Sequence, residues 1–301
     1  MLSRYEFEFL KYVEENGCTT IDIRTAADDL FISKNTIEGI LLSFTTNGLV
    51  EEREKSIVIT KKGIDLLEPY RVKRAIILAA GFGSRMMPAT KDRPKPMVTV
   101  NGTRIIDTLI DSLVKKGIRD ITIVRGYKKD CFEELYAKYP FVSFIDNDMY
   151  SSTNNISSMM LALDLLKDGC YLCEADLYIS NPNVIAKYQY SSNILGSYSL
   201  ETDDWSFKMK DGFISDYQKG NTYCYNYYGI SFWTAEDCNK LREDFAKVWD
   251  MDGGKDYFWE FIPLVLCKEN YQVEIRPCAK QDIIEIDNYH ELALLDSSYK
   301  E

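Results

Sequence analysis

The sequence predicts an α/β protein with a mostly parallel, doubly wound sheet, preceded by a smaller domain of helices and one β hairpin. Two observations support this fold class. From residue 74 onward, short apolar runs alternate with stretches of helical periodicity, as in strands joined by crossover helices. Before residue 73 the periodicity is mostly helical. We therefore expect one domain over residues 1–72 and a larger one over residues 73–301, joined by the short segment 69–73.

The smaller domain is expected to hold helices, a hairpin and a closing helix. Ser33 is a suitable N-cap for the third helix, and Asn47-Gly48 is a typical helix end. Residues 49–60 then alternate and bend through Glu54-Lys55, as expected of a β wing. The expected helices cover residues 3–16, 23–31, 33–47 and 60–67.

The stretch Ile32-Ser33-Lys34-Asn35-Thr36-Ile37 resembles the turn and recognition helix of winged helix-turn-helix domains of bacterial regulators. In those domains the third helix enters the major groove of DNA. Residues 1–73, however, carry 10 Lys+Arg and 13 Asp+Glu, whereas a DNA-binding module usually presents a basic face. The best candidates for phosphate contact are Lys55, Lys61 and Lys62. The charge therefore favours protein contacts, homodimerisation among them, over DNA binding.

The larger domain alternates strands with helices. The expected strands cover residues 76–78, 121–124, 142–145 and 171–173, and the expected helices cover residues 105–116, 130–138 and 154–166. Such a pattern forms a mostly parallel sheet that binds ligands at the carboxyl ends of its strands. Gly81 and Asp176 both follow strands directly, so both should lie at that edge. Mixed strands and helices beyond Ser191 predict a further ligand-binding extension.

Composition excludes several classes of protein. The net charge of −11 does not favour broad nucleic-acid binding, and no apolar run reaches 18 residues, so no membrane span is expected. The first residues lack an apolar signal region, which predicts a cytoplasmic location. Cys170 and Cys173 form an isolated CxxC in a predicted strand, where their side chains point to opposite faces, so we expect structural thiols. A single histidine, His290, weakens any Ser-His-Asp interpretation.

The most informative motif is Ala79-Ala80-Gly81-Phe82-Gly83-Ser84-Arg85, which follows a short buried strand and precedes Pro94-Lys95-Pro96. Glycines let backbone N–H groups approach an anion closely, and Arg85 and Lys95 supply positive charge for a polyphosphate. The flanking prolines restrict the backbone on both sides of Lys95. The motif lacks the third glycine of a dinucleotide fingerprint and the GK[ST] ending of a P-loop.

Residues 78–97 resemble the signature of nucleotidyltransferases that join an NTP to a phosphorylated acceptor, LAAGxGSRxxPxTxxxPKxM, with every fixed position kept. The resemblance implies a Rossmann-like nucleotidyltransferase fold and catalytic roles for Arg85, Lys95 and Asp176. It also implies that Asp176 and Asp287 hold Mg²⁺, although Asp287 could instead be an ordinary helix cap. The implied nucleotide contacts of the bend are Leu78, Ala79, Ala80, Gly81, Gly83 and Ser84.

Further stretches resemble bacterial CTP:phosphocholine cytidylyltransferases. Gly126-Tyr127 and the run Asn154-Asn155-Ile156-Ser157 are similar to segments of that family, the latter near the nucleotide base. The nucleotide contacts that this implies are Tyr127, Asn154, Asn155 and Ser157, with a helix cap as the alternative for Asn154. Residues 203–205, 229–233 and 257–260 resemble acceptor segments, and aromatic faces attract quaternary ammonium groups. The implied acceptor contacts are Trp205, Tyr227, Trp233, Asp256, Tyr257, Trp259 and Glu260, although most rings in this half could be core.

The resemblance implies a Mg²⁺-dependent enzyme that converts CTP and phosphocholine to CDP-choline and pyrophosphate. Phosphoethanolamine, 2-aminoethylphosphonate and a sugar 1-phosphate remain open as acceptors, and a primary ammonium would prefer carboxylates to rings. A different class of function is a transcription regulator whose larger domain senses a nucleotide or choline compound. Retention of Arg85, Lys95, Asp176 and Asp287 argues against that alternative. We favour an enzyme whose first domain mediates dimerisation or regulation.

Overall fold

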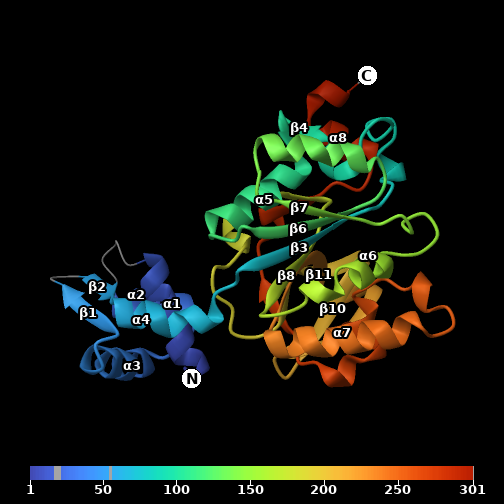
Figure 1. Ribbon diagram of the computed structural model, residues 1–301. Coiled ribbons are helices and arrows are strands. Elements are labelled where there is room, and N and C mark those ends of the chain that lie inside the picture. The colour runs from blue at the N-terminus through green and yellow to red at the C-terminus, as the bar shows by residue number, and fades with distance from the viewer. Residues whose placement is uncertain (17–21, 54–55, 301) are drawn as a thin grey trace. The chain divides into compact units, whose positions relative to one another are not determined.

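The computed structural model describes residues 1–16, 22–53 and 56–300, and the chain forms two compact units (Figure 1). The first unit comprises Met1–Arg71 together with Tyr188–Tyr190, and the second comprises the rest of the chain from Val72 onward. None of the described helices combines the length and the apolar character needed to cross a membrane.

The first unit consists of three helices, a two-stranded hairpin and a closing helix. Its elements are α1 (Arg4–Asn16), α2 (Ile23–Leu30), α3 (Lys34–Thr46), β1 (Val50–Arg53), β2 (Ser56–Ile59) and α4 (Lys61–Leu67). Polar caps begin the helices: the Ser33 hydroxyl accepts a hydrogen bond from the Thr36 amide at 3.2 Å at the start of α3. The two strands pair antiparallel. The expected bend at Glu54-Lys55 lies outside the described residues, and so do Gly17 and Cys18.

A short segment from far along the chain, Tyr188–Tyr190, completes the first unit. Tyr188 is fully buried in the core of this unit, and the ring of Tyr190 stacks on that of Tyr70 at 5.6 Å and 8°. Arg71 donates a hydrogen bond to the Tyr188 hydroxyl at 3.0 Å. The core of this unit therefore extends beyond the segment 1–72 that the sequence predicts.

The second unit is built on a seven-stranded sheet in the order β12-β10-β11-β8-β3-β6-β7. Its strands are β3 (Arg74–Ala79), β6 (Asp120–Arg125), β7 (Ser143–Asp146), β8 (Cys170–Glu174), β10 (Asn193–Lys210), β11 (Phe213–Trp233) and β12 (Glu274–Pro277). Strand β3 runs parallel to β6 and β8, β6 runs parallel to β7, and β11 is antiparallel to its neighbours β8 and β10. The predicted α/β class with a mostly parallel sheet is confirmed.

Helices cover both faces of this sheet (Figure 1). Helix α5 (Ile105–Lys115) packs on one face, and α6 (Ile156–Leu161) and α7 (Ala235–Trp249) pack on the other. Residues alternate between the two cores along β8, so Cys170 and Cys173 lie on opposite faces, as their spacing predicts. The helix expected over 130–138 is instead a 3₁₀ segment, Lys129–Ala137, and the one expected over 154–166 is interrupted after Leu161.

Two short strands outside the main sheet bring the acidic residues Asp176 and Asp287 together. Strand β9 (Leu177–Ile179) pairs antiparallel with β13 (Ile283–Glu285), with Leu177 opposite Glu285. This pairing places the residue before β9 and the residues after β13 at the same end of the ladder. Asp176 and Asp287 therefore meet, although they are far apart in the sequence. Helix α8 (Tyr289–Leu295) follows, and β4 (Thr99–Val100) pairs with β5 (Thr103–Arg104) beside α5.

Candidate active site

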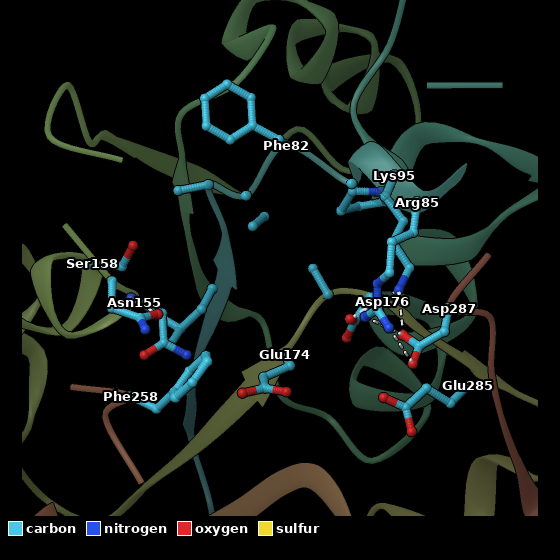
Figure 2. A pocket seen from close by; sticks show the side chains of 18 of the residues that line it. Phe82, Arg85, Lys95, Asn155, Ser158, Glu174, Asp176, Phe258, Glu285 and Asp287 are labelled. Atoms are coloured by element: carbon cyan, nitrogen blue, oxygen red, sulfur yellow. Dashed lines mark hydrogen bonds and ion pairs between the residues drawn. The ribbon is translucent and has the colours of Figure 1, made fainter. Parts of the chain in front are cut away.

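A cavity of about 710 Å³ opens at the carboxyl ends of β3 and β8, within the second unit (Figure 2). Strand β3 has β6 on one side and β8 on the other, so the cavity lies at the point where successive strands are added in opposite directions. Ligand sites of open α/β sheets occur at this position. The residues of this cavity that carry charge are Arg85, Lys95, Glu174, Asp176, Asp203, Asp204, Lys219, Glu260, Glu285 and Asp287.

The glycine-rich bend forms one wall of the cavity and packs against Lys95. Gly83 has a φ of +59°, and a Cβ at this position would lie 2.8 Å from the Cβ of Lys95. A larger residue would therefore be strained and would also push the lysine away. The carbonyl of Gly83 accepts a hydrogen bond from the Thr90 hydroxyl at 3.0 Å, which ties the bend to the segment that leads to Lys95.

Lys95 lies at the centre of an ion-pair cluster. Its Nζ is 3.0 Å from Asp176 Oδ2 and 3.4 Å from Asp287 Oδ1, and its side chain is only 8% exposed. Burial alone would lower the pKa of Lys95, but the charges of Asp176 and Asp287 outweigh that effect and raise it, so the ammonium stays protonated. Arg85 forms two hydrogen bonds with Asp287, at 3.1 and 3.2 Å, from a more exposed position.

Three carboxylates of this cluster could hold a divalent cation. Asp176, Glu285 and Asp287 each offer an oxygen atom, and these atoms lie within 4.8 Å of one another. Asp176 Oδ1 is buried and has no hydrogen-bond partner among the described residues. Desolvation, reinforced by the charges of Asp176 and Asp287, raises the pKa of Glu285 to about 8, although its side chain stays open to the cavity. Oxygen ligands of this kind fit Mg²⁺.

The caps of the neighbouring helices leave the predicted site residues available. The N-cap of α8 is Asn288, whose side chain accepts a hydrogen bond from the Glu291 amide, so the alternative of Asp287 as an ordinary helix cap is wrong. The N-cap position of α6 is Asn155, and Asn154 makes no cap there. The Asn154 side chain instead donates to the carbonyl of Asp256 at 3.1 Å.

Most of the residues predicted to contact the nucleotide line the cavity, and two do not. Those that line it are Leu78, Ala79, Ala80, Gly81, Gly83, Ser84, Asn154 and Asn155. Ser157 is fully buried and accepts a hydrogen bond from the Asn147 amide at 2.9 Å. Tyr127 lies behind the bend, with its ring 5.4 Å from that of Phe82 and its hydroxyl donating to the Thr90 carbonyl at 3.2 Å. Both residues therefore support the wall of the cavity.

The predicted acceptor residues divide in the same way. Trp205, Tyr227 and Glu260 line the cavity, whereas Asp256 and Tyr257 do not. Trp233 and Trp259 are 0% and 1% exposed, and their rings pack against each other at 6.2 Å in the core behind α7. The prediction that these two tryptophans contact the acceptor is therefore wrong, because the apolar core buries both large indoles away from the cavity surface.

The cavity also contains residues that the sequence analysis did not single out. These include Phe82, Tyr150, Ser158 and Lys219, of which Ser158 lies beside Asn155 (Figure 2) and Lys219 comes from β11. Glu285 could have been found, because it stands two positions before Asp287 and alternate residues of a strand share a face. Phe82 lies within the glycine-rich bend itself, and the other three give no signal in the sequence, since the packing of distant segments brings them to the cavity.

Two further carboxylates lie away from the Lys95 cluster. Glu174, at the end of β8, is half-buried between that cluster and the side formed by Asn155 and Phe258 (Figure 2). Burial and the charges of Glu260 and Asp176 raise its pKa well above the ordinary value. Burial likewise raises the pKa of Glu260, which is 3% exposed. In total seven carboxylates and three basic side chains line the cavity.

Comparison with known proteins agrees with this geometry. The Nucleotidyl transferase family model matches residues 74–192. A 2-aminoethylphosphonate cytidylyltransferase of Lancefieldella rimae is 38% identical over 228 residues, which cover 75% of this chain and 92% of the relative. A choline-phosphate cytidylyltransferase of Streptococcus pneumoniae is 31% identical over 234 residues, which cover 75% of this chain and 98% of the relative.

Solved structures show the same fold. The structure of the CTP:phosphocholine cytidylyltransferase from Streptococcus pneumoniae aligns with a TM-score of 0.70 at 31% identity, covering 76% of this chain and 100% of that chain. The fold, the cavity and these relatives define a nucleotidyltransferase, and the chain belongs to the nucleotidyltransferase family. Within that family, its relatives named here are cytidylyltransferases.

Proposed function

We propose that the protein transfers a cytidylyl group from CTP to a small phosphorylated or phosphonate acceptor that carries an amine, with 2-aminoethylphosphonate as the favoured acceptor. The observation that carries this proposal is the Lys95–Asp176–Asp287 cluster beside the glycine-rich bend, in a chain whose relatives are cytidylyltransferases. An acceptor oxygen attacks the α-phosphorus of CTP and forms a new P–O bond. The bond from that phosphorus to the bridging oxygen breaks, and pyrophosphate leaves with the electron pair.

The residues of the cluster have distinct roles in this reaction. Both reactants are anions, so catalysis consists mainly of alignment and charge compensation. The backbone of the bend and Arg85 bind the phosphates, and the buried ammonium of Lys95 holds positive charge beside the reacting centre. Asp176 and Asp287, with Glu285, would hold Mg²⁺, which when bound neutralises charge on phosphate oxygens. Because Lys95 contacts two of these carboxylates, it also orients them.

The excess of carboxylates supports an acceptor with a positive charge. Burial raises the pKa values of Glu174, Glu260 and Glu285, but the four aspartates of the cavity still outnumber its three basic side chains, which favours an acceptor that carries a positive charge. An amine-bearing acceptor brings a charge that these walls attract. The relative at 38% identity is named for 2-aminoethylphosphonate, which carries both an amine and a phosphonate.

Phosphocholine is the second candidate, because several aromatic rings also line the cavity. Trp205, Tyr227 and Phe258 could attract a trimethylammonium group by their faces. The relative at 31% identity is named for this acceptor. Phosphoethanolamine differs from phosphocholine only in the three methyl groups and therefore separates the effect of rings from that of carboxylates.

For the first unit we propose a role in protein contacts, homodimerisation included, over DNA binding. On α3 the Lys34 ammonium is paired with Glu38 at 3.3 Å, and Lys61 is paired with Asp65 at the start of α4. These pairings neutralise two of the cations that could meet phosphates. A gel shift at low salt against random duplex DNA tests the point: a shift at sub-micromolar protein would overturn it.

The test of the main proposal is pyrophosphate release from CTP and Mg²⁺ with a panel of acceptors. The panel contains 2-aminoethylphosphonate, phosphoethanolamine, phosphocholine and glucose 1-phosphate, each also tested with UTP in place of CTP. We expect turnover with CTP and the amine-bearing acceptors, highest with 2-aminoethylphosphonate. Equal or higher turnover with glucose 1-phosphate would overturn the acceptor class, and equal turnover with UTP would overturn the cytidylyl specificity.

A further inference from the structure

A carboxylate of the cavity rests on a glycine of the neighbouring strand. Ile230 of β11 pairs with Cys173 of β8, so Gly229 and Glu174 are the next residues along these two antiparallel strands. A Cβ on Gly229 would lie 2.5 Å from Glu174 Oε2 and 2.6 Å from its Cδ and Cγ. The end of the Glu174 side chain therefore occupies the space that any other residue at position 229 would fill.

A second carboxylate nearby has an unused acceptor atom. Glu260 is 3% exposed, and its Oε1 accepts a hydrogen bond from the Tyr217 hydroxyl at 3.2 Å. Its Oε2 is buried and has no hydrogen-bond partner among the described residues, although Glu260 lines the cavity. The Tyr227 hydroxyl lies 3.5 Å from Glu174 Oε1, and the rings of Tyr217 and Tyr227 are 5.6 Å apart. The two carboxylates and two phenols therefore form one group, in which Glu260 and Tyr217 are buried and Glu174 and Tyr227 are half-buried.

None of the three basic side chains of the cavity forms an ion pair with this group among the described residues. Lys95 is paired with Asp176 and Asp287, Arg85 is paired with Asp287, and Lys219 makes no ion pair with either glutamate. Neither Glu174 nor Glu260 has an ion-pair partner among the described residues. A buried carboxylate without a counter-charge is costly, so these two groups are poised for a cation that the protein itself does not supply.

We propose that Glu174 and Glu260 bind the primary ammonium group of the acceptor, and that Gly229 sets the position of the Glu174 carboxylate for this contact. The inference rests on the proposed cytidylyl transfer and names the residues that select its acceptor. A primary ammonium has three N–H donors, which match the free Oε2 of Glu260 and the carboxylate of Glu174. A trimethylammonium group has none and cannot satisfy either atom.

Of the rings predicted to meet the acceptor, Trp205 is already packed against its neighbours. A cage for a quaternary ammonium needs ring faces that are open to the ligand. One face of Trp205 is covered by Tyr217, whose ring stacks on it at 5.0 Å and 20°, and Phe261 meets it edge-on at 5.3 Å. Glu174 lies between the Lys95 cluster and Asn155 in the close view of the cavity (Figure 2). An acceptor whose amine contacts Glu174 can therefore direct its anionic end toward Lys95.

Two substitutions test the site by different means. Glu260→Gln removes the charge with little change in volume, and Gly229→Ala displaces the Glu174 carboxylate without changing any charge. We expect each to lower kcat/KM for 2-aminoethylphosphonate and phosphoethanolamine about 10- to 100-fold, the range of a hydrogen bond to a charged group. The kcat/KM for phosphocholine should change less than about 3-fold, because its trimethylammonium group has no N–H donor to lose a hydrogen bond. The KM for CTP should stay within a factor of about two in both variants, because neither residue is among those predicted to contact the nucleotide.

Matched controls are Glu243→Gln, an exposed carboxylate of α7, and Gly39→Ala, a glycine of α3 where an added Cβ would meet no other atom within 4 Å. Calorimetric titration with 2-aminoethylphosphonate gives acceptor affinity independently of turnover, and it should weaken in parallel in both site variants. Equal losses of kcat/KM for primary and quaternary acceptors, or no loss of kcat/KM in Glu260→Gln, would overturn the inference. The proposed function would still stand in that case, provided that the wild-type enzyme is active. Wild-type enzyme that prefers phosphocholine would also overturn it. If the wild type turned over none of the acceptors, both the function and the inference would be wrong.

Discussion

Replacing Lys95 with methionine should separate the structural role of the Lys95 cluster from its role in turnover. The substitution removes the positive charge that Asp176 and Asp287 share, at 3.0 and 3.4 Å from Nζ. Removing one partner of a fully buried ion pair costs about 3–5 kcal/mol. The side chains of the two aspartates are 33% and 22% exposed, so water partly hydrates the charges that remain. We therefore expect a loss of about 2–3 kcal/mol in unfolding free energy without divalent metal.

Thermal unfolding in EDTA and in Mg²⁺ measures this loss. For a unit of this size it corresponds to a fall in Tm of about 4–12 °C in EDTA. If Asp176, Glu285 and Asp287 hold Mg²⁺, the added cation should restore most of the lost stability in Lys95→Met and add less to the wild type. Pyrophosphate release should fall about 100- to 1000-fold, because a charge aimed at the reacting phosphates is gone.

Lys129→Met is the matched control for this experiment. The Lys129 ammonium also lies between two carboxylates, at 3.1 Å from Asp146 and 3.1 Å from Asp148, but its side chain is 36% exposed and lies outside the cavity. We expect a much smaller fall in Tm than in Lys95→Met, because water screens this exposed pairing, and we expect unchanged turnover. Similar falls in Tm for the two variants in EDTA would refute the energetic reasoning, and near-normal turnover in Lys95→Met would remove this lysine from the active site.

Three further outcomes follow from the same geometry. Asp176→Asn should reduce pyrophosphate release below detection while circular dichroism stays close to wild type and Tm falls less than in Lys95→Met, because Asp287 still pairs with the Lys95 ammonium; substantial turnover would exclude Asp176 from the metal site. Trp259→Ala should cost about 3–5 kcal/mol in denaturant unfolding, because its ring is 1% exposed in the core, and a change in acceptor KM at unchanged stability would contradict this placement. The pKa of Glu285 is about 8 without metal, and its proton must leave before the carboxylate can bind Mg²⁺. Calorimetric Mg²⁺ affinity should therefore rise between about pH 6 and pH 8, and an equal rise in Glu285→Gln would show that another group is responsible.

The wall of the cavity formed by the glycine-rich bend could be predicted because its signals are contiguous in the sequence. A buried strand, a bend with Gly83 at positive φ, and a lysine between two prolines follow one another closely along the chain, and each constrains the backbone locally. Asp176 could be predicted for a similar reason, since it follows a strand whose neighbours in the sheet are set by βαβ connections. Local chemistry and simple topology were sufficient for these residues.

The acidic partners on the other side of the cavity depend on contacts that no local pattern encodes. Arg85 and Asp287 are 202 positions apart, and they meet because β9 and β13, each three residues long, pair with one another. Strands this short carry too little periodicity to reveal a partner. Neighbouring aromatic residues also differ in their surroundings: Phe258 lines the cavity, whereas Trp259 lies in the core. The sequence alone does not distinguish the two, because both are aromatic residues of the same segment.

The charge of the cavity connects the metal cluster with the acceptor site. Two anionic substrates would enter a space whose walls already carry more negative than positive groups. A divalent ion at Asp176, Glu285 and Asp287 would offset this excess at one end, beside the phosphates. It cannot serve Glu174 and Glu260, which instead accept hydrogen bonds from the phenols of Tyr227 and Tyr217. Under the proposed function, a positive charge on the acceptor would occupy that second place, and the cavity would then favour an acceptor with an amine over a plain phosphate.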